Sequence, residues 1–222
     1  MTAKRLLMAA TAMLAAACGG AANDRATAAS DAQQATASPS SDAGALPSAA
    51  YALVGDASRL SFVSIKAGDV IETHRFDGLS GGVSADGVGR LVVDLASVNT
   101  GIDIRNERMR EVFFEIANFP EATIETEIDA AAFKDLSVGE RRPVDIDGAL
   151  TLHGVEAPIV AEAFITRLSE TRVAVDSAAP VPVDAAAFDL GDGVEALREL
   201  AGLPSITPAS LVTFSLVYDA GE

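Results

Sequence analysis

Apolar side chains recur at every second position in several stretches of the chain, and this period constrains the fold more than any other feature. The longest example is Val144, Ile146, Gly148, Leu150 and Leu152. The same period is found in residues 90–95, 123–128, 172–176 and 211–218, and less cleanly in 60–66, 70–78 and 159–168. Successive side chains of a β-strand point to opposite faces, so each stretch predicts a strand with one apolar face. Many short strands separated by glycine turns predict an antiparallel barrel or sandwich.

Two segments follow a helical period instead. The apolar positions are Met109, Val112, Phe113 and Ile116 in residues 103–117, and Val194, Leu197 and Leu200 in residues 192–201. Such spacing places apolar side chains on one face of a helix. Asp103 is the expected N-cap of the first helix, and Pro120 prevents its continuation.

The first 18 residues have the features of an export signal. Lys4 and Arg5 precede the apolar run Leu6–Leu14, which is shorter than the roughly 20 residues that a membrane-spanning helix needs. The only cysteine, Cys18, follows three alanines, and this arrangement resembles a bacterial lipobox. The alternative is an ordinary signal-peptidase site. We expect an exported protein on the periplasmic side of the cell envelope, anchored to a bacterial membrane by lipid on Cys18.

Residues 19–50 differ in composition from the rest of the chain. They are mainly Ala, Ser, Thr, Gly, Gln and Asp, and Leu46 is the only large apolar residue among them. Such a segment buries too little apolar surface to offset the entropy lost on ordering, so it predicts a disordered tether. Residues 51–219 are then the predicted folded domain, long enough for one sizeable core.

Charge and residue counts exclude several classes of function. The formal net charge is -16, with 32 acidic and 16 basic residues, whereas nucleic-acid binding needs a basic surface. One cysteine and two histidines favour neither an intramolecular disulfide nor a metal centre. The sequence carries no local catalytic motif, so we expect a non-enzymatic protein without a cofactor. A hydrolase with paired carboxylates stays open as an alternative.

The densest cluster of charge is Asp103–Arg110, which contains Arg105 and Arg108 on one helix face. One interpretation is a solvated face with ion pairs to nearby acids of the same segment, namely Asp103, Glu107 and Glu111. The other is a cationic clamp at the mouth of a cavity, suited to a phosphate or polar head group. His74 shares a strand face with Val70 and Phe76, which predicts either a core histidine or a polar group in a ligand cavity.

The order of motifs resembles the YceI-like family, a bacterial lipid- or polyisoprenoid-binding domain. The motifs that carry the resemblance are Ser58-x-Leu60-x-Phe62, Phe76–Gly81, Val98–Gly101, Arg105–Arg110 with Phe113 and Phe114, Phe119-Pro120, and Gly148–Val155. Together they cover roughly residues 51–219. Tyr51 stands where the family has tryptophan, Asn106 stands where it has an acid, and the segment 185–208 looks longer than the family average.

The resemblance implies an all-β fold, an eight-stranded antiparallel lipocalin-like barrel with one or two short helices. It also implies an apolar cavity that holds an isoprenoid lipid, either a polyprenyl phosphate or an isoprenoid quinone, for sequestration or transport. The expected ligand-binding residues are Phe62, His74, Phe76, Leu91, Val93, Arg105, Arg108, Phe113, Leu150, Leu152, Phe164 and Phe214. The oligomeric state stays open, with a dimer as one possibility.

Two further interpretations belong to other classes of protein. In the first, the barrel is filled by its own side chains, and the acidic surface binds a partner as an envelope interaction or stress protein. In the second, the domain is a lipid hydrolase whose site has no recognisable motif.

Overall fold

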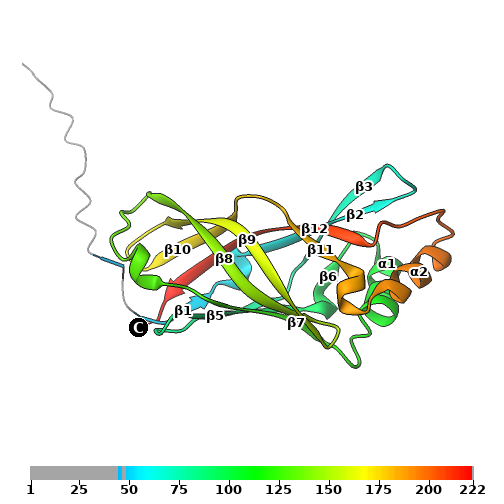
Figure 1. Ribbon diagram of the computed structural model, residues 1–222, viewed down its shortest axis with the longest axis horizontal. Helices are drawn as coiled ribbons and strands as arrows, with labels where there is room; N and C mark the ends of the chain where they lie inside the picture. Colours follow the sequence, from blue (N-terminus) through cyan, green and yellow to red (C-terminus); the bar gives the residue numbers. More distant parts are fainter. Residues whose placement is uncertain (1–44, 47–48, 222) are drawn as a thin grey trace, which may run out of the picture. The chain divides into compact units, whose positions relative to one another are not determined.

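The computed structural model describes residues 45–46 and 49–221, and it consists mainly of β-strands (Figure 1). The strands are β1 Tyr51–Leu53, β2 Arg59–Lys66, β3 Val70–Phe76, β4 Leu79–Val83, β5 Val88–Asp94, β6 Val98–Asn99, β7 Glu121–Glu127, β8 Arg141–Leu152, β9 Val155–Arg167, β10 Arg172–Ser177, β11 Val181–Asp184 and β12 Ala209–Ala220. Short helical turns are η1 Gly55–Ala57, η2 Leu95–Ser97, η4 Ala130–Phe133 and η5 Ala185–Phe188. The strands predicted from period two are therefore confirmed.

The strands form an eight-stranded, closed antiparallel barrel, as the resemblance implied. Several wall positions are shared by two consecutive strands. β1 and β2 both pair with β12, at Leu53↔Tyr218 and Phe62↔Val212, so they occupy one position in succession. In the same way, β4 and β3 together form the next position of the wall, and β5 and β6 form the one after it. β11 continues the line of β10, and both strands pair with β12. The pairing of β1 with β12 closes the barrel.

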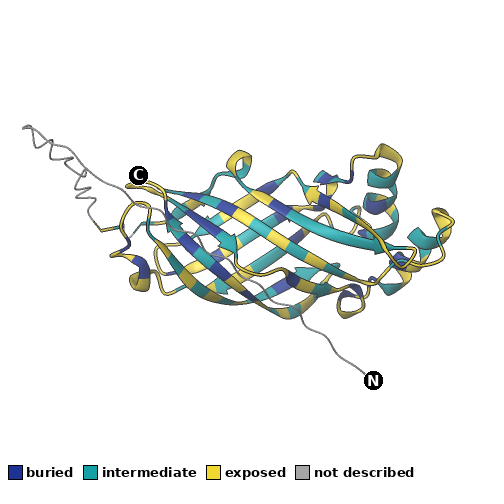
Figure 2. Cartoon of the chain, turned by 90° about the horizontal axis from the view of Figure 1, so that it is seen from above, coloured by how far each residue is buried: buried dark blue, intermediate teal, exposed yellow. Residues whose placement is uncertain are grey.

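Residues that alternate along the sequence face alternately the inside and the outside of the barrel. Exposed and covered residues alternate along the strands, as Figure 2 shows. On β9, Ala161, Ala163 and Ile165 are buried, while Val160, which directly precedes them and points to the other face, is 62% exposed. A closed barrel leaves no free strand edge in its ring and needs apolar residues only on its inner face.

The helical segments lie at one end of the barrel, together with the protruding β2–β3 hairpin (Figure 1). They are α1 Asp103–Arg108, the π-helical turn η3 Met109–Phe113, and α2 Gly191–Leu200. The second predicted helix is confirmed within one residue at each end. No described helix combines the length and the apolar character that crossing a membrane would require.

The first predicted helix is wrong in two respects. It does not continue as an α-helix to residue 117, because the Phe114 N–H donates to the Met109 carbonyl at 2.8 Å and widens the turn. Both Phe113 and Phe114 line the barrel cavity. The N-cap residue is Ile102, not Asp103, and its side chain makes no capping hydrogen bond. Tertiary packing of the two phenylalanines therefore overrides the regular helical period.

A residue that precedes β1 also contacts the barrel. The N–H of Leu46 donates to the Lys134 carbonyl at 2.8 Å, and the Leu46 side chain packs against the core. The end of the predicted 19–50 tether is thus in contact with the barrel. Residues 19–44 and 47–48 of that segment, and the predicted signal 1–18 with Cys18, lie outside the described residues.

Candidate functional site

The barrel encloses a cavity of about 750 Å³. This volume lies within the range of small-molecule sites, about 300–1,000 Å³. Its lining is mostly apolar and extends from Leu46 and Tyr51 near β1 to Met109, Leu197 and Ile206 near the helices. One alternative from the sequence was a barrel filled by its own side chains. A cavity of this volume does not agree with that alternative.

The predicted ligand-binding residues gather along this cavity with one exception. Those that line it are Phe62, His74, Phe76, Leu91, Val93, Arg105, Arg108, Phe113, Leu150, Leu152 and Phe214. They come from strands far apart in the chain and from the helical segment. Phe62 lies 5.2 Å from both the His74 ring and the Phe76 ring, measured between ring centroids. Ligand binding by these residues stays a prediction.

Phe164 is the exception, and its prediction as a cavity residue was wrong. It falls between Ala163 and Ile165 on β9, both of which are buried on the inner side. The Arg141 guanidinium lies 3.8 Å from the centroid of the Phe164 ring, a cation–π contact on the other face of the wall. Aromatic character suggested a binding residue, but strand parity decides the face.

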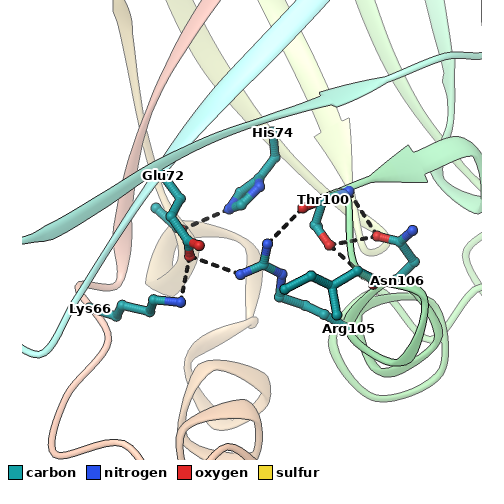
Figure 3. Close-up of polar contacts among 8 residues, drawn as sticks. Lys66, Glu72, His74, Thr100, Arg105 and Asn106 are labelled. Atoms are coloured by element: carbon teal, nitrogen blue, oxygen red, sulfur yellow. Dashed lines mark hydrogen bonds and ion pairs between the residues drawn. The ribbon is translucent and has the colours of Figure 1, made fainter.

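A cluster of charged residues lies where β2, β3 and α1 meet, and Figure 3 shows its contacts. Glu72 Oε2 is 2.5 Å from Lys66 Nζ and 2.8 Å from Arg105 Nη1. The hydrogen bond from Lys66, together with the positive charges of Lys66 and Arg105, holds the pKa of Glu72 below its usual value, against the effect of burial. The carboxylate is therefore ionised at neutral pH and balances one of the two cations.

Arg105 is held on a second side by the loop that precedes α1. Its Nη2 donates to the Thr100 carbonyl at 2.7 Å. The Asn106 side-chain oxygen accepts hydrogen bonds from the N–H of Thr100 at 2.8 Å and from its hydroxyl at 2.7 Å. Arg108 Nη1 donates to the Leu200 carbonyl at 3.1 Å. The arginines are thus tied to the fold, but through Glu72 and carbonyl oxygens and not through the acids of their own segment.

His74 points from β3 into the same region. Its Nε2 shares a hydrogen bond of 2.9 Å with Ser64 Oγ. The residue is 4% exposed, and burial, followed by the positive charge of Arg105, lowers the pKa of its imidazole. The neutral ring keeps one more hydrogen-bonding nitrogen. Within the described part of the chain, His74 Nδ1 and Arg105 Nε are buried and lack a hydrogen-bond partner.

Sequence reasoning missed three members of this cluster, Lys66, Glu72 and Ser64. Glu72 was detectable, because it lies two residues from His74 and so shares the inner face of β3. Ser64 and Lys66 needed the register of the hairpin, in which Ser64 lies opposite Glu72 and Lys66 opposite Val70. The ion pair with Arg105 was not detectable, since α1 reaches β3 only in the folded barrel.

The charged residues that line the cavity are mostly basic, whereas the chain as a whole is acidic. The cavity is lined by the basic residues Lys66, Arg90, Arg105, Arg108 and Lys134, and by the acidic residue Glu72. Among the residues that the structure describes, no group of three His, Cys, Asp or Glu side chains is arranged to hold a metal ion. The arrangement is that of an apolar binding site with a polar region near α1.

Comparison with known proteins agrees with this architecture. The family model of the YceI-like domain matches residues 51–217, and the chain belongs to that family. A solved polyisoprenoid-binding domain from Saccharophagus degradans, implicated in plant cell wall breakdown, is 47% identical. The alignment covers 78% of this chain and 99% of that domain, with a TM-score of 0.76. No match was found among curated proteins.

Two more distant structures share the fold. BcnA of Burkholderia cenocepacia is 20% identical over 74% of this chain and 98% of that protein, with a TM-score of 0.58. The YCEI protein of Campylobacter jejuni is 14% identical over 67% of this chain and 85% of that protein, with a TM-score of 0.50.

Proposed function

We propose that this protein binds an isoprenoid lipid, with the tail in the barrel cavity and the polar head beside His74 and Arg105. The observation that carries the proposal is an apolar cavity of about 750 Å³ with two unpartnered polar atoms at one place in its wall. Burial of an apolar chain is worth about 0.8 kcal/mol per CH₂. The binding of polyisoprenoids by the domain from Saccharophagus degradans gives independent support.

The two head groups under consideration differ in charge. A polyprenyl phosphate is anionic, whereas a quinone is neutral and offers carbonyl oxygens. The charge of Arg105 is already balanced in part by Glu72, which Lys66 also contacts. A neutral head would accept hydrogen bonds without competing with this carboxylate, whereas an anionic head would have to compete with it for the charges of Lys66 and Arg105. We therefore favour the isoprenoid quinone.

Sequestration or transport is the activity proposed for this site, without catalysis and without a cofactor other than the bound lipid. The test is mass spectrometry of an organic extract from protein purified without detergent. We expect one isoprenoid per chain. A folded barrel that yields no isoprenoid would contradict the proposal, and a bound hydrolysis product would favour the alternative lipid hydrolase.

Export and anchoring are a separate part of the proposal. Cys18 directly follows a short apolar run and three alanines, which supports lipidation at this residue and a location on the periplasmic side of the envelope. Cys18→Ser, expressed in the native host, should move the protein from the membrane fraction to the soluble periplasm. An unchanged membrane fraction would show that Cys18 carries no anchor.

A further inference from the structure

Five of the large apolar residues that are exposed belong to the β2–β3 hairpin, α1 with its N-cap, and α2, and these elements lie at one end of the barrel (Figure 1). The set is Val70, Ile71, Ile102, Ile104 and Leu200, which are 42%, 66%, 48%, 53% and 49% exposed, and we call it the apolar rim. The other large apolar residues exposed in the described chain, such as Val160 on β9, belong to other elements. An exposed apolar cluster beside a cavity indicates a contact surface.

The apolar rim adjoins the polar cluster of the cavity. Ile71 and Ile104 directly precede Glu72 and Arg105, which are joined by the 2.8 Å ion pair. The Leu200 carbonyl accepts the hydrogen bond of Arg108. Glu72, Arg105 and Arg108 all line the cavity. The rim therefore borders the place where the cavity wall changes from apolar to polar.

We propose that the apolar rim docks on the surface of a phospholipid bilayer, so that the bound lipid exchanges between cavity and membrane there. This inference rests on the proposed function, because an isoprenoid lipid resides in bilayers and does not cross water readily. Each CH₂ group of the lipid tail lowers its partitioning from a bilayer into water about fourfold. Apolar side chains that enter the boundary between head groups and acyl chains provide such a contact.

The charge of the chain indicates which kind of bilayer surface the apolar rim can bind. The whole chain carries -16, which disfavours an anionic surface. Near the rim, the cations Lys66, Arg105 and Arg108 are accompanied by the acids Asp69, Glu72, Asp103 and Glu107. Charge therefore provides no net attraction, and insertion of the rim residues must provide the binding. The expected partner is therefore a zwitterionic phospholipid surface, and binding to it should depend little on salt concentration.

The described chain begins at the other end of the barrel. The described chain begins at Ala45, and Leu46 is bonded to Lys134 next to η4. β1 and the C-terminal residues lie at the same end of the barrel, opposite α1 and α2 (Figure 1). The connection to residues 1–44 is therefore at the end away from the rim.

The absence of tryptophan from the sequence permits a direct test. Ile104→Trp in the full chain provides a single fluorescent reporter in the rim, and Val160→Trp provides a matched control on the barrel wall. Vesicles of phosphatidylcholine with brominated acyl chains quench only a tryptophan that reaches the acyl region. We expect quenching of Ile104→Trp to exceed that of Val160→Trp by about fivefold or more.

Additional variants keep the test decisive. Ile71→Trp serves as a second reporter if Ile104→Trp does not fold, and Ile71→Ser with Leu200→Ser should reduce the quenching of Ile104→Trp. Equal quenching at positions 104 and 160, or none at either, would overturn the docking. A blue-shifted emission without vesicles, together with a doubled mass in sedimentation, would show that the rim contacts a second copy and would also overturn it.

The same preparations distinguish this inference from the proposed function. Protein that retains a stoichiometric isoprenoid but shows no quenching contradicts only the bilayer contact. Protein that yields no isoprenoid contradicts the proposed function, whatever the fluorescence shows.

Discussion

Arg105 and Glu72, which are 33 residues apart in sequence, form an ion pair with 2.8 Å between Nη1 and Oε2. The pair joins α1 to β3 beside the cavity, and about a quarter of the Arg105 side chain and a third of the Glu72 side chain remain exposed. It holds the helix against the barrel and sets the charge that a bound head group meets.

Removal of the carboxylate should change the preference for head groups. In Glu72→Gln, Arg105 and Lys66 lose their counter-charge, and an anionic phosphate can take its place. Hydrogen bonds to charged groups contribute about 1.5–3 kcal/mol, so we expect affinity for a polyprenyl phosphate to rise about tenfold relative to a quinone. Competitive binding of the two lipids measures the ratio. Glu195→Gln, which removes one ion-pair partner of Arg198 on α2, should leave the ratio unchanged.

The two arginines should affect stability more than the selection between head groups. Arg105→Ala with Arg108→Ala removes the contacts to Glu72, Thr100 and Leu200. For a loss of about 1–2 kcal/mol we expect Tm to fall by about 3–8 °C. Calorimetry checks this, with Arg110→Ala as the control. A selective loss of phosphate binding at unchanged Tm would instead support a cationic clamp.

Two leucines test whether the cavity is open space. Leu136 is 0% exposed and does not line the cavity, so Leu136→Ala should cost about 2–5 kcal/mol of unfolding free energy. Leu152 lines the cavity, where one side already lacks packing atoms, so Leu152→Ala should cost less. Denaturant unfolding of ligand-free protein measures both. Equal costs would indicate that the region around Leu152 is tightly packed.

Stability should depend on pH through His74. Burial lowers its pKa from the ordinary value of 6.5, so the folded state resists protonation. As pH falls below 6.5, the unfolded chain binds the proton first, and unfolding free energy decreases until the lowered pKa is reached. His74→Gln should remove this part of the pH dependence. Unfolding curves measured between about pH 5 and 7.5, a range around the ordinary value, check this prediction. His153→Gln, measured in parallel, shows whether the effect belongs to His74.

The segment before β1 should contribute to stability. Leu46→Ser keeps the backbone bond to Lys134 but removes an apolar side chain that packs against the core and lines the cavity. We expect Tm to fall by about 2–6 °C, the equivalent of roughly 1–1.5 kcal/mol. Leu211→Ser, at a position 45% exposed on β12, is the control. An unchanged Tm would show that the predicted tether extends to residue 50 after all.

The sequence by itself determined which residues form strands and which side of each strand is apolar. Val144, Ile146, Leu150 and Leu152 illustrate this, because the period of two is a property of the extended backbone and needs no partner strand. The same parity would have excluded Phe164 from the cavity and included Glu72. The choice between barrel and sandwich came from the family resemblance and not from the period.

The tertiary structure decided what the period cannot express. The π-helical turn depends on packing of Phe113 and Phe114 in the cavity, and the absence of a side chain at Gly193 allows α2 to approach Phe113 closely. The partner of Arg105 was decided in the same way, since local acids were available in the sequence, yet Glu72 is the residue that folding brings to the guanidinium. Contacts between distant segments follow from barrel closure, and no local spacing encodes them.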